Sequence, residues 1–417
     1  MRDRWTEHRL ADLAAVERGL SWSREQESAV RTADSCAVVR IGNVRPDGID
    51  MSDRLYITRV SPQDRQRKAI NPTTILMVGS NGNPDRVGNA YLATADVVDH
   101  LYASFLIGID AANTTLARYL ALWLQSDRVQ QSITEATSGS TGLKNIGLRW
   151  LRDMVVRLPP VAEQRRIADL IRAVDAAAGR AMSEDAAAQG LVAALRTELI
   201  AAADSPRCRL GDVLDRIDGG VSPLTEGRAP TTGEPSVLKL SAVRPGRFRP
   251  EEAKALPTDI VMPEAAVVRV GDVLITRSNT PETVGYVCLV DRVSPKTYLS
   301  DLILRLHPRP DLLPGYLAEA LVTDDARAQI MGSARGTSGS MRKISRATIR
   351  EVEIPLPVSV EAQRVVVALL TAAAHVRDAA HNTAERTAAL RSTLLGSMLS
   401  GEHEIPASYD RFLDGAA

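Results

Sequence analysis

Two short loops of this sequence combine the residue types that bind phosphate. They are Thr137–Ile146 (TSGSTGLKNI) and Thr337–Ile344 (TSGSMRKI), and both contain glycines, small hydroxyl side chains and cations. Phosphate oxygens accept hydrogen bonds from backbone N–H groups, hydroxyls and Lys or Arg side chains. The pattern therefore predicts phosphate contacts, with an ordinary glycine-rich surface loop as the alternative. The candidate residues are Ser140, Lys144, Asn145, Ser340, Arg342 and Lys343.

Two Ser-Asn dipeptides, each directly after an apolar segment of strand character, form a second pair of candidates. They are Ser80-Asn81 and Ser278-Asn279, the latter preceded by Arg277. Asn can pair bidentately with adenine, and Arg with guanine, in the major groove of DNA. These residues are therefore candidates for reading base edges. Because Asn is also a frequent turn former, a plain turn remains the alternative.

The sequence has no motif for cofactor or nucleotide chemistry. GxxxxGK[ST] is absent, and no GxGxxG opens a helix after a strand. Asn71-Pro72-Thr73-Thr74 lacks the second proline and the aromatic of an amino-methyltransferase motif, and the six histidines have no metal-ligand spacing. A serine hydrolase built on Ser138 or Ser338 stays open, because catalytic triads assemble in space. We predict a chain without catalytic residues, metal or cofactor of its own.

Composition limits the compartment and the mode of binding. The formal net charge is zero, from 51 basic and 51 acidic residues, whereas a freely DNA-binding domain usually has a basic excess. If DNA is the ligand, charge must be sorted locally or partners must share the phosphate contacts. Three dispersed cysteines without CxxC fit a reducing cytoplasm. We expect no signal peptide and no membrane span.

The two halves of the chain repeat each other at an offset near 200 residues. Thr137–Ser140 and Thr337–Ser340 are identical, and Tyr119-Leu120-Ala121 is repeated at Tyr316-Leu317-Ala318. A dozen such matches occur in the same order in both halves. Each repeat is far larger than the 20–50 residues of a solenoid unit, so the pattern indicates a duplicated domain.

Each repeat begins with short β-branched segments and ends in a long amphipathic stretch. Short helices are expected at 115–126 and 315–323, and long helices at 162–203 and 361–399. The apolar spacing of the long helices is close to 3.5 residues, the coiled-coil period. We predict an α+β fold, in which two similar mixed α/β globules are joined by two long helices that form an antiparallel coiled coil. The alternative is that each helix packs on its own globule.

A family resemblance rests on the motifs at the domain junctions. Leu158–Ile167 (LPPVAEQRRI) and its degenerate copy Leu356–Arg364, together with Gly219–Pro223 and Gly271–Arg277, resemble the signatures of type I restriction-modification specificity subunits. The first half departs from the family pattern. It has Glu17–Ser21 in place of the Gly-Gly-Thr-Pro turn, and Thr73–Leu76 where the second half has Gly-Asp-Val-Leu. The DNA contacts of the first half are therefore the less certain.

The resemblance implies two target recognition domains, at 1–158 and 205–356, conserved spacer helices at 159–204 and 357–402, and a tail at 403–417. It implies a non-catalytic subunit that reads a bipartite site in double-stranded DNA and docks two methyltransferase subunits. These partners would carry S-adenosylmethionine, and restriction-motor subunits can join. The alternatives are a specificity subunit of another phage-defence or type II-like restriction system, or a stand-alone DNA-modifying enzyme.

Overall fold

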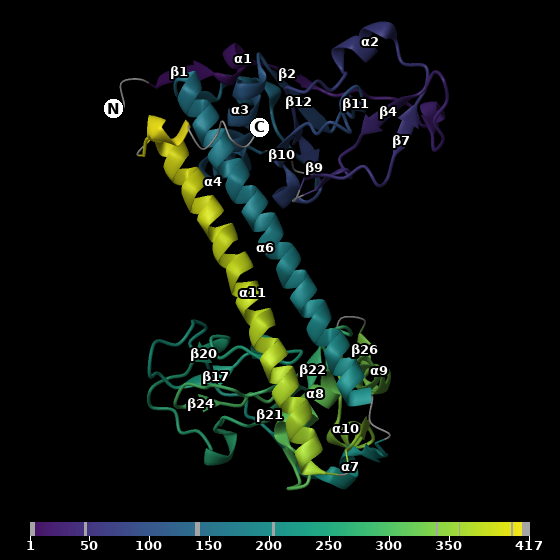
Figure 1. Ribbon diagram of the computed structural model, residues 1–417, viewed down its shortest axis with the longest axis vertical. Helices are drawn as coiled ribbons and strands as arrows, with labels where there is room; N and C mark the ends of the chain where they lie inside the picture. Colours follow the sequence, from purple (N-terminus) through teal and green to yellow (C-terminus); the bar gives the residue numbers. More distant parts are fainter. Residues whose placement is uncertain are drawn as a thin grey trace. The chain divides into compact units, whose positions relative to one another are not determined.

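The structure is a computed structural model that describes residues 5–45, 48–137, 142–201, 205–338, 341–357, 359–401 and 403–410. It divides into two compact units. Unit 1 comprises Met1–Ala181 and Thr383–Ala417, and unit 2 comprises Met182–Asn382. Each unit therefore contains one globule and one part of each long helix (Figure 1).

Unit 1 is built on a four-stranded sheet in the order β10-β8-β12-β2. Its central strand, β8 (Thr74–Val78), is buried along its whole length, as expected for the run Ile-Leu-Met-Val with neighbours on both sides. The other strands of this sheet are β10 (Ala90–Leu92), β12 (Leu106–Ala111) and β2 (Ala14–Arg18). A second sheet has the order β11-β4-β7-β3, with bounds Leu101–Tyr102, Cys36–Val39, Leu55–Ile57 and Glu27–Ser28.

Unit 2 repeats this topology. Its main sheet has the order β23-β21-β25-β16, with bounds Val287–Leu289, Val273–Thr276, Ile303–Pro308 and Leu214–Gly219. The second sheet runs β24-β17-β20, with bounds Thr297–Tyr298, Ser236–Leu238 and Ala253–Ala255. Strand by strand, this is the order of unit 1 without an equivalent of β3. The duplication seen in the sequence is thus a duplication of fold.

A helix pair packs on the main sheet of each unit. In unit 1 the pair is α3 (Thr114–Gln125) and α4 (Asp127–Ala136), and in unit 2 it is α8 (Pro314–Val322) and α9 (Asp324–Ser333). The helices α3 and α8 lie within one residue of the positions expected from the sequence. Buried residues of α3 such as Tyr119 and Leu120 join the same core as Ile75 and Ile109 of the sheet.

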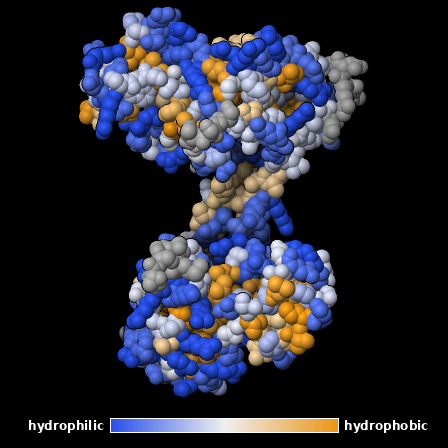
Figure 2. All heavy atoms as spheres, turned by 180° about the vertical axis from the view of Figure 1, so that it is seen from behind, coloured by the Kyte–Doolittle hydropathy of each residue, from blue (hydrophilic) through white to orange (hydrophobic). Residues whose placement is uncertain are grey.

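The long helices are α6 (Val161–Ala201) and α11 (Val360–Ser400), each 41 residues long. They pack against each other in both units. Asp175 pairs with Arg391 in unit 1, and Asp185 pairs with His381 in unit 2. As the number rises by ten on α6, it falls by ten on α11, so the helices are antiparallel. The predicted antiparallel helix pair is confirmed, and hydrophilic and moderately hydrophobic side chains line its exposed stretch (Figure 2).

The buried seam of the helix pair follows part of the predicted spacing. Ile171, Ala181 and Val192 of α6 and Leu370 of α11 are buried at predicted positions, whereas Val376 and Leu390 are 60% and 50% exposed. None of the helices within the described residues combines the length and the apolar character that a membrane crossing needs.

Candidate nucleic-acid interface

In unit 2 the two sequence motifs come together in one small sheet. The strand β22 (Ser278–Asn279) pairs antiparallel with β27 (Met341–Lys343), which also pairs with β26 (Arg335–Ser338). Ser278 lies opposite Lys343, and Asn279 lies opposite Arg342. The backbone N–H of Ile344 donates to the carbonyl of Arg277 at 2.9 Å and extends the pairing. Base-reading and phosphate-binding candidates, more than 60 positions apart in the chain, are thus neighbours.

Unit 1 repeats this juxtaposition. The strand β9 (Ser80–Asn81) pairs antiparallel with β13 (Lys144–Asn145), so that Lys144 is opposite Asn81 and Asn145 is opposite Ser80. Matching the two pairings places Asn145 where unit 2 has Lys343, and Lys144 where it has Arg342. We call each of these paired segments a reading ladder. The candidates Ser140 and Ser340 lie outside the described residues.

The side chains of the reading ladders fall into two groups. Asn145, Arg277 and Lys343 are exposed, and Asn81, Lys144, Asn279 and Arg342 are half-buried. Ser80 and Ser278, by contrast, are only 4% and 2% exposed, so these two hydroxyls face the protein. The serines therefore fit the role of supporting the ladder better than that of touching a ligand.

Arg18 organises the ladder of unit 1, although the sequence did not single it out for a role. Its Nη2 donates to Oδ1 of Asn145 at 2.5 Å and to the carbonyl of Ile146 at 2.8 Å, and its Nη1 donates to Oγ of Ser80 at 3.3 Å. Burial lowers the pKa of Arg18 from its ordinary value. One signal in the sequence could have pointed to Arg18. The segment Glu17–Ser21 departs from the family pattern and has this arginine directly before Gly19.

Gly19 in unit 1 and Gly220 in unit 2 occupy equivalent positions. A Cβ on Gly19 would lie 2.3 Å from the carbonyl oxygens of Tyr102 and Ala103, and a Cβ on Gly220 would lie 2.1 Å from that of Leu299. Only glycine fits so close an approach between two backbones. The first half thus keeps the glycine of the turn although the residues around it differ.

Unit 2 gathers further cations around its reading ladder. Asn279 lines a cavity of about 510 Å³ together with Lys239, Arg244 and Lys254. Arg277, Arg335 and Lys343 line a second cavity of about 580 Å³, which also contains the carboxylate of Glu351. The motifs did not reveal these further cations, because they lie outside both motifs in sequence. Lys239 and Lys254 are remote from both, and Arg335 precedes the glycine-rich loop by two positions. This clustering meets the requirement for local charge sorting in a chain of zero net charge.

The described residues contain no group of three or more His, Cys, Asp or Glu side chains that could hold a metal ion. Cys36, Cys208 and Cys288 are free thiols. Of the serines considered for a hydrolase, Ser138 lies outside the described residues, and the side chain of Ser338 is not described.

Comparison with known proteins places this geometry in context. Residues 2–181 match the family described as the type I restriction modification DNA specificity domain. The Escherichia coli EcoEI type I restriction enzyme specificity subunit is 31% identical over 152 residues, which cover 36% of this chain and 26% of that relative. The match thus spans about a quarter of that relative's length.

Two further similarities extend over the whole chain. The EcoKI specificity subunit of E. coli K12 is 22% identical over 424 residues, covering 95% of this chain and 89% of that relative. The crystal structure of the type I restriction-modification S subunit from M. genitalium superposes with a TM-score of 0.56 at 13% identity, covering 94% of this chain and 96% of that one. This last similarity establishes a common fold.

Proposed function

We propose that the chain is a type I restriction-modification specificity subunit, to which residues 2–181 are similar, and that it reads a bipartite DNA target, one half with each unit. The observation that carries the proposal is the pair of reading ladders. Two copies of a fold each place an Asn beside a short cationic strand, in the same register. A bipartite target is what two similar reading surfaces on one chain would recognise.

In this proposal the exposed and half-buried ladder residues contact the DNA, except Asn145, whose Oδ1 accepts from Arg18 and Ser80. Asn81, Asn279 and Arg277 read base edges in the major groove, where Asn suits adenine and Arg suits guanine. Lys144, Arg342 and Lys343 bind the phosphates alongside. Arg18, Ser80 and Asn145 hold the ladder of unit 1 in shape through their mutual hydrogen bonds.

We also propose that the chain acts in the cytoplasm as a docking subunit without catalysis. Two methyltransferase subunits, which carry S-adenosylmethionine, would bind the helix pair, and restriction-motor subunits would join them. Support comes from apolar side chains that the helices leave exposed in unit 2, among them Met182 (63%), Leu191 (55%) and Val376 (60%). In the proposal these side chains, two on α6 and one on α11, are covered by a bound partner subunit.

The test is to co-express the chain with its methyltransferase partners and to map methylated bases across the host genome. We expect one target made of two short defined sequences separated by undefined positions. The chain alone, incubated with DNA and S-adenosylmethionine, should transfer no methyl groups. A contiguous target, or turnover by the chain alone, would contradict the proposal.

A further inference from the structure

A cavity of about 350 Å³ in unit 2 lies between the helix pair and a β-hairpin. The hairpin consists of β18 (Val243–Arg244) and β19 (Arg247–Phe248). Its turn abuts α6, because a Cβ on Gly246 would lie 3.1 Å from Nη2 of Arg196. The cavity volume is more than ten times the roughly 30 Å³ that one water occupies in the liquid. The cavity can therefore admit a hydrated oxyanion.

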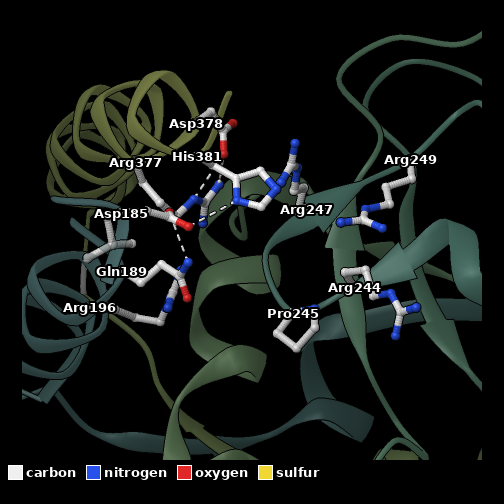
Figure 3. A pocket seen from close by; sticks show the side chains of 11 residues that line it. Asp185, Gln189, Arg196, Arg244, Pro245, Arg247, Arg249, Arg377, Asp378 and His381 are labelled. Atoms are coloured by element: carbon white, nitrogen blue, oxygen red, sulfur yellow. Dashed lines mark hydrogen bonds and ion pairs between the residues drawn. The ribbon is translucent and has the colours of Figure 1, made fainter. Parts of the chain in front are cut away.

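Five arginines and two carboxylates line this cavity, together with His381 (Figure 3). The charges on the helices are paired. Arg196 contacts Glu319 at 2.6 Å, Arg377 contacts Asp378 at 2.9 Å, and His381 contacts Asp185 at 3.1 Å. The hairpin contributes the other three arginines, Arg244, Arg247 and Arg249, and we call them the hairpin arginines.

The hairpin arginines have no side-chain hydrogen bond or ion pair to any of the residues that the structure describes. All three are half-buried. Their neighbours Val243 and Phe248 are buried in the core of the unit, so the alternation of the strands holds the arginines on the outer face. Asp185 attracts Arg247, and Glu252 attracts Arg249, without a direct contact. Three half-buried arginines lining one cavity repel each other, and a bound anion would lower that repulsion further.

Unit 1 supplies an internal comparison. Its equivalent hairpin is β5 (Val44–Arg45) with β6 (Gly48–Ile49), in the same pairing register. Arg45 there matches Arg244, but it is paired with Asp50 at 2.9 Å, and Gly48 and Asp50 stand where unit 2 has Arg247 and Arg249. The fold of the hairpin therefore does not require the extra arginines. Their presence in unit 2 points to a ligand.

The cavity adjoins the reading face of unit 2, because Arg244 lines both this cavity and the cavity of Asn279, Lys239 and Lys254. Cations thus extend from the reading ladder across the hairpin to the helix pair. A phosphodiester backbone is the polyanion that such a continuous line of cations fits.

We propose that the hairpin arginines bind DNA phosphates just beyond the half-site that unit 2 reads, on the side of the helix pair. The contact is independent of base sequence and is specific to unit 2. This inference rests on the proposed function, because it assumes that the reading ladder of unit 2 faces DNA. Because only unit 2 makes this contact, the two half-sites are bound with unequal strength.

The test replaces all three hairpin arginines by Gln in the assembled methyltransferase complex. DNA binding is measured by equilibrium titration with a duplex containing the mapped target, and with an unrelated duplex, over a range of salt concentrations. Each lost phosphate contact lowers the slope of log K against log[salt] by about 0.9, so the slope should fall by roughly 2.7. Affinity for both duplexes should fall roughly 10- to 100-fold near 0.15 M salt, while their ratio is unchanged.

Two further variants act as controls. Replacing all three by Lys keeps the charge and should retain most of the salt slope, and it provides a test if the Gln variant folds poorly. Gln at Arg216, Arg292 and Arg309 removes the same number of charges from unit 2 outside the cavity and should leave DNA binding unchanged.

The outcomes separate this inference from the proposed function. Wild-type affinity and slope in the Gln variant would overturn the inference, and weaker capture of the methyltransferase subunits in that case would identify an acidic protein as the ligand. If the wild-type complex itself shows no preference for a bipartite sequence, the proposed function fails instead.

Discussion

At the scale of single residues, some ladder side chains can be substituted without disturbing the ladder, and others cannot. Oδ1 of Asn145 accepts from both Arg18 and Ser80 at 2.5 Å, and Arg342 donates to the carbonyl of Ala334 at 3.1 Å. Removing Asn145 or Arg342 would therefore disturb the ladder as well as any ligand contact. Lys144 and Lys343 are the cleaner probes, because their backbones pair in the ladders while their side chains make no hydrogen bond or ion pair with the described residues.

We expect Lys144→Ala with Lys343→Ala to weaken DNA binding by the assembled complex for every sequence. Two lost phosphate contacts should reduce the salt slope by about 1.8 and leave the methylated target unchanged. Filter binding at several salt concentrations gives the slope, and Arg31→Ala with Arg292→Ala, which likewise removes one cation from each unit, here at exposed positions, serves as a matched control. An unaltered slope would mean that these lysines do not contact DNA. The variants Lys144→Ala/Asn145→Ala and Arg342→Ala/Lys343→Ala should lose more DNA affinity, because removing Asn145 or Arg342 also disturbs the ladder.

Glu163 provides a prediction about pH. The residue is 8% exposed, and its pKa is raised first by burial and then by the carboxylate of Glu404, against the effect of a hydrogen bond with Trp5. A raised carboxyl pKa means that the folded state holds the proton longer than the unfolded state. This contribution to stability is fully present below the unfolded pKa of about 4.3, and it is lost as pH rises through the folded pKa.

The Glu163→Gln variant has no proton to lose at this position, so it should not lose stability as the pH rises. The melting temperature of the variant, relative to wild type, should therefore increase from pH 4 to pH 7. Thermal unfolding followed by circular dichroism across this range measures the difference. A difference that is constant with pH would show that Glu163 does not titrate differently on folding.

At the scale of elements, a glutamine anchors the beginning of each long helix, but with unequal bonds. Gln363 is 1% exposed; its Oε1 accepts from the N–H of Leu313, and its Nε2 donates to the carbonyl of Asp311, both at 2.8 Å. It thereby ties α11 to the loop before α8. Gln164 donates only to the carbonyl of Pro159 at 2.8 Å.

Gln363→Ala should therefore destabilise unit 2 by about 1–3 kcal/mol, because it removes two hydrogen bonds of a buried side chain at roughly 0.5–1.5 kcal/mol each. Gln164→Ala, with one such bond, should cost about 0.5–1.5 kcal/mol in unit 1. Urea unfolding of both variants tests the ranking. Equal losses would show that the two bonds of Gln363 are not what anchors α11.

At the scale of the whole molecule, the length of the helix pair should set the spacing of the DNA target. Deleting Ala181–Ala187 removes seven residues, keeps the 3.5-residue seam in register and shortens α6 by about 10 Å. Deleting Ala379–Glu385 shortens α11 to match, because His381 lies opposite Asp185. Three base pairs span a similar length at ~3.4 Å each, but they also rotate the second half-site by about 100°.

We expect the single deletion in α6 to impair assembly, because α11 resists the change. The paired deletion should alter the spacer while both half-site sequences stay as they are. Methylation mapping in cells that carry each variant reads out both properties. Altered half-site bases with an unaltered spacer would show that the helices do not set the distance.

The sequence by itself determined the features that depend on local pattern and on internal repetition. A period near 3.5 residues gave both long helices to within two residues of their ends, because a buried stripe on a long helix needs that spacing. Collinear matches such as Tyr119 with Tyr316 revealed the duplication, and both tyrosines are fully buried in their cores. The same duplication made the fold class predictable.

Only the tertiary structure decided which distant residues meet. Ser80 bonds to Asn145 across 65 positions, and Arg18 bonds to Asn145 across 127, and no local period encodes such a partner. The same reason applies to the hairpin arginines, whose sequence, Arg-Pro-Gly-Arg-Phe-Arg, is that of an ordinary charged turn. They line a cavity with Arg377 because the β18–β19 hairpin packs beside the helix pair of unit 2. Strand pairing and helix packing, rather than the residue types, brought these charges together.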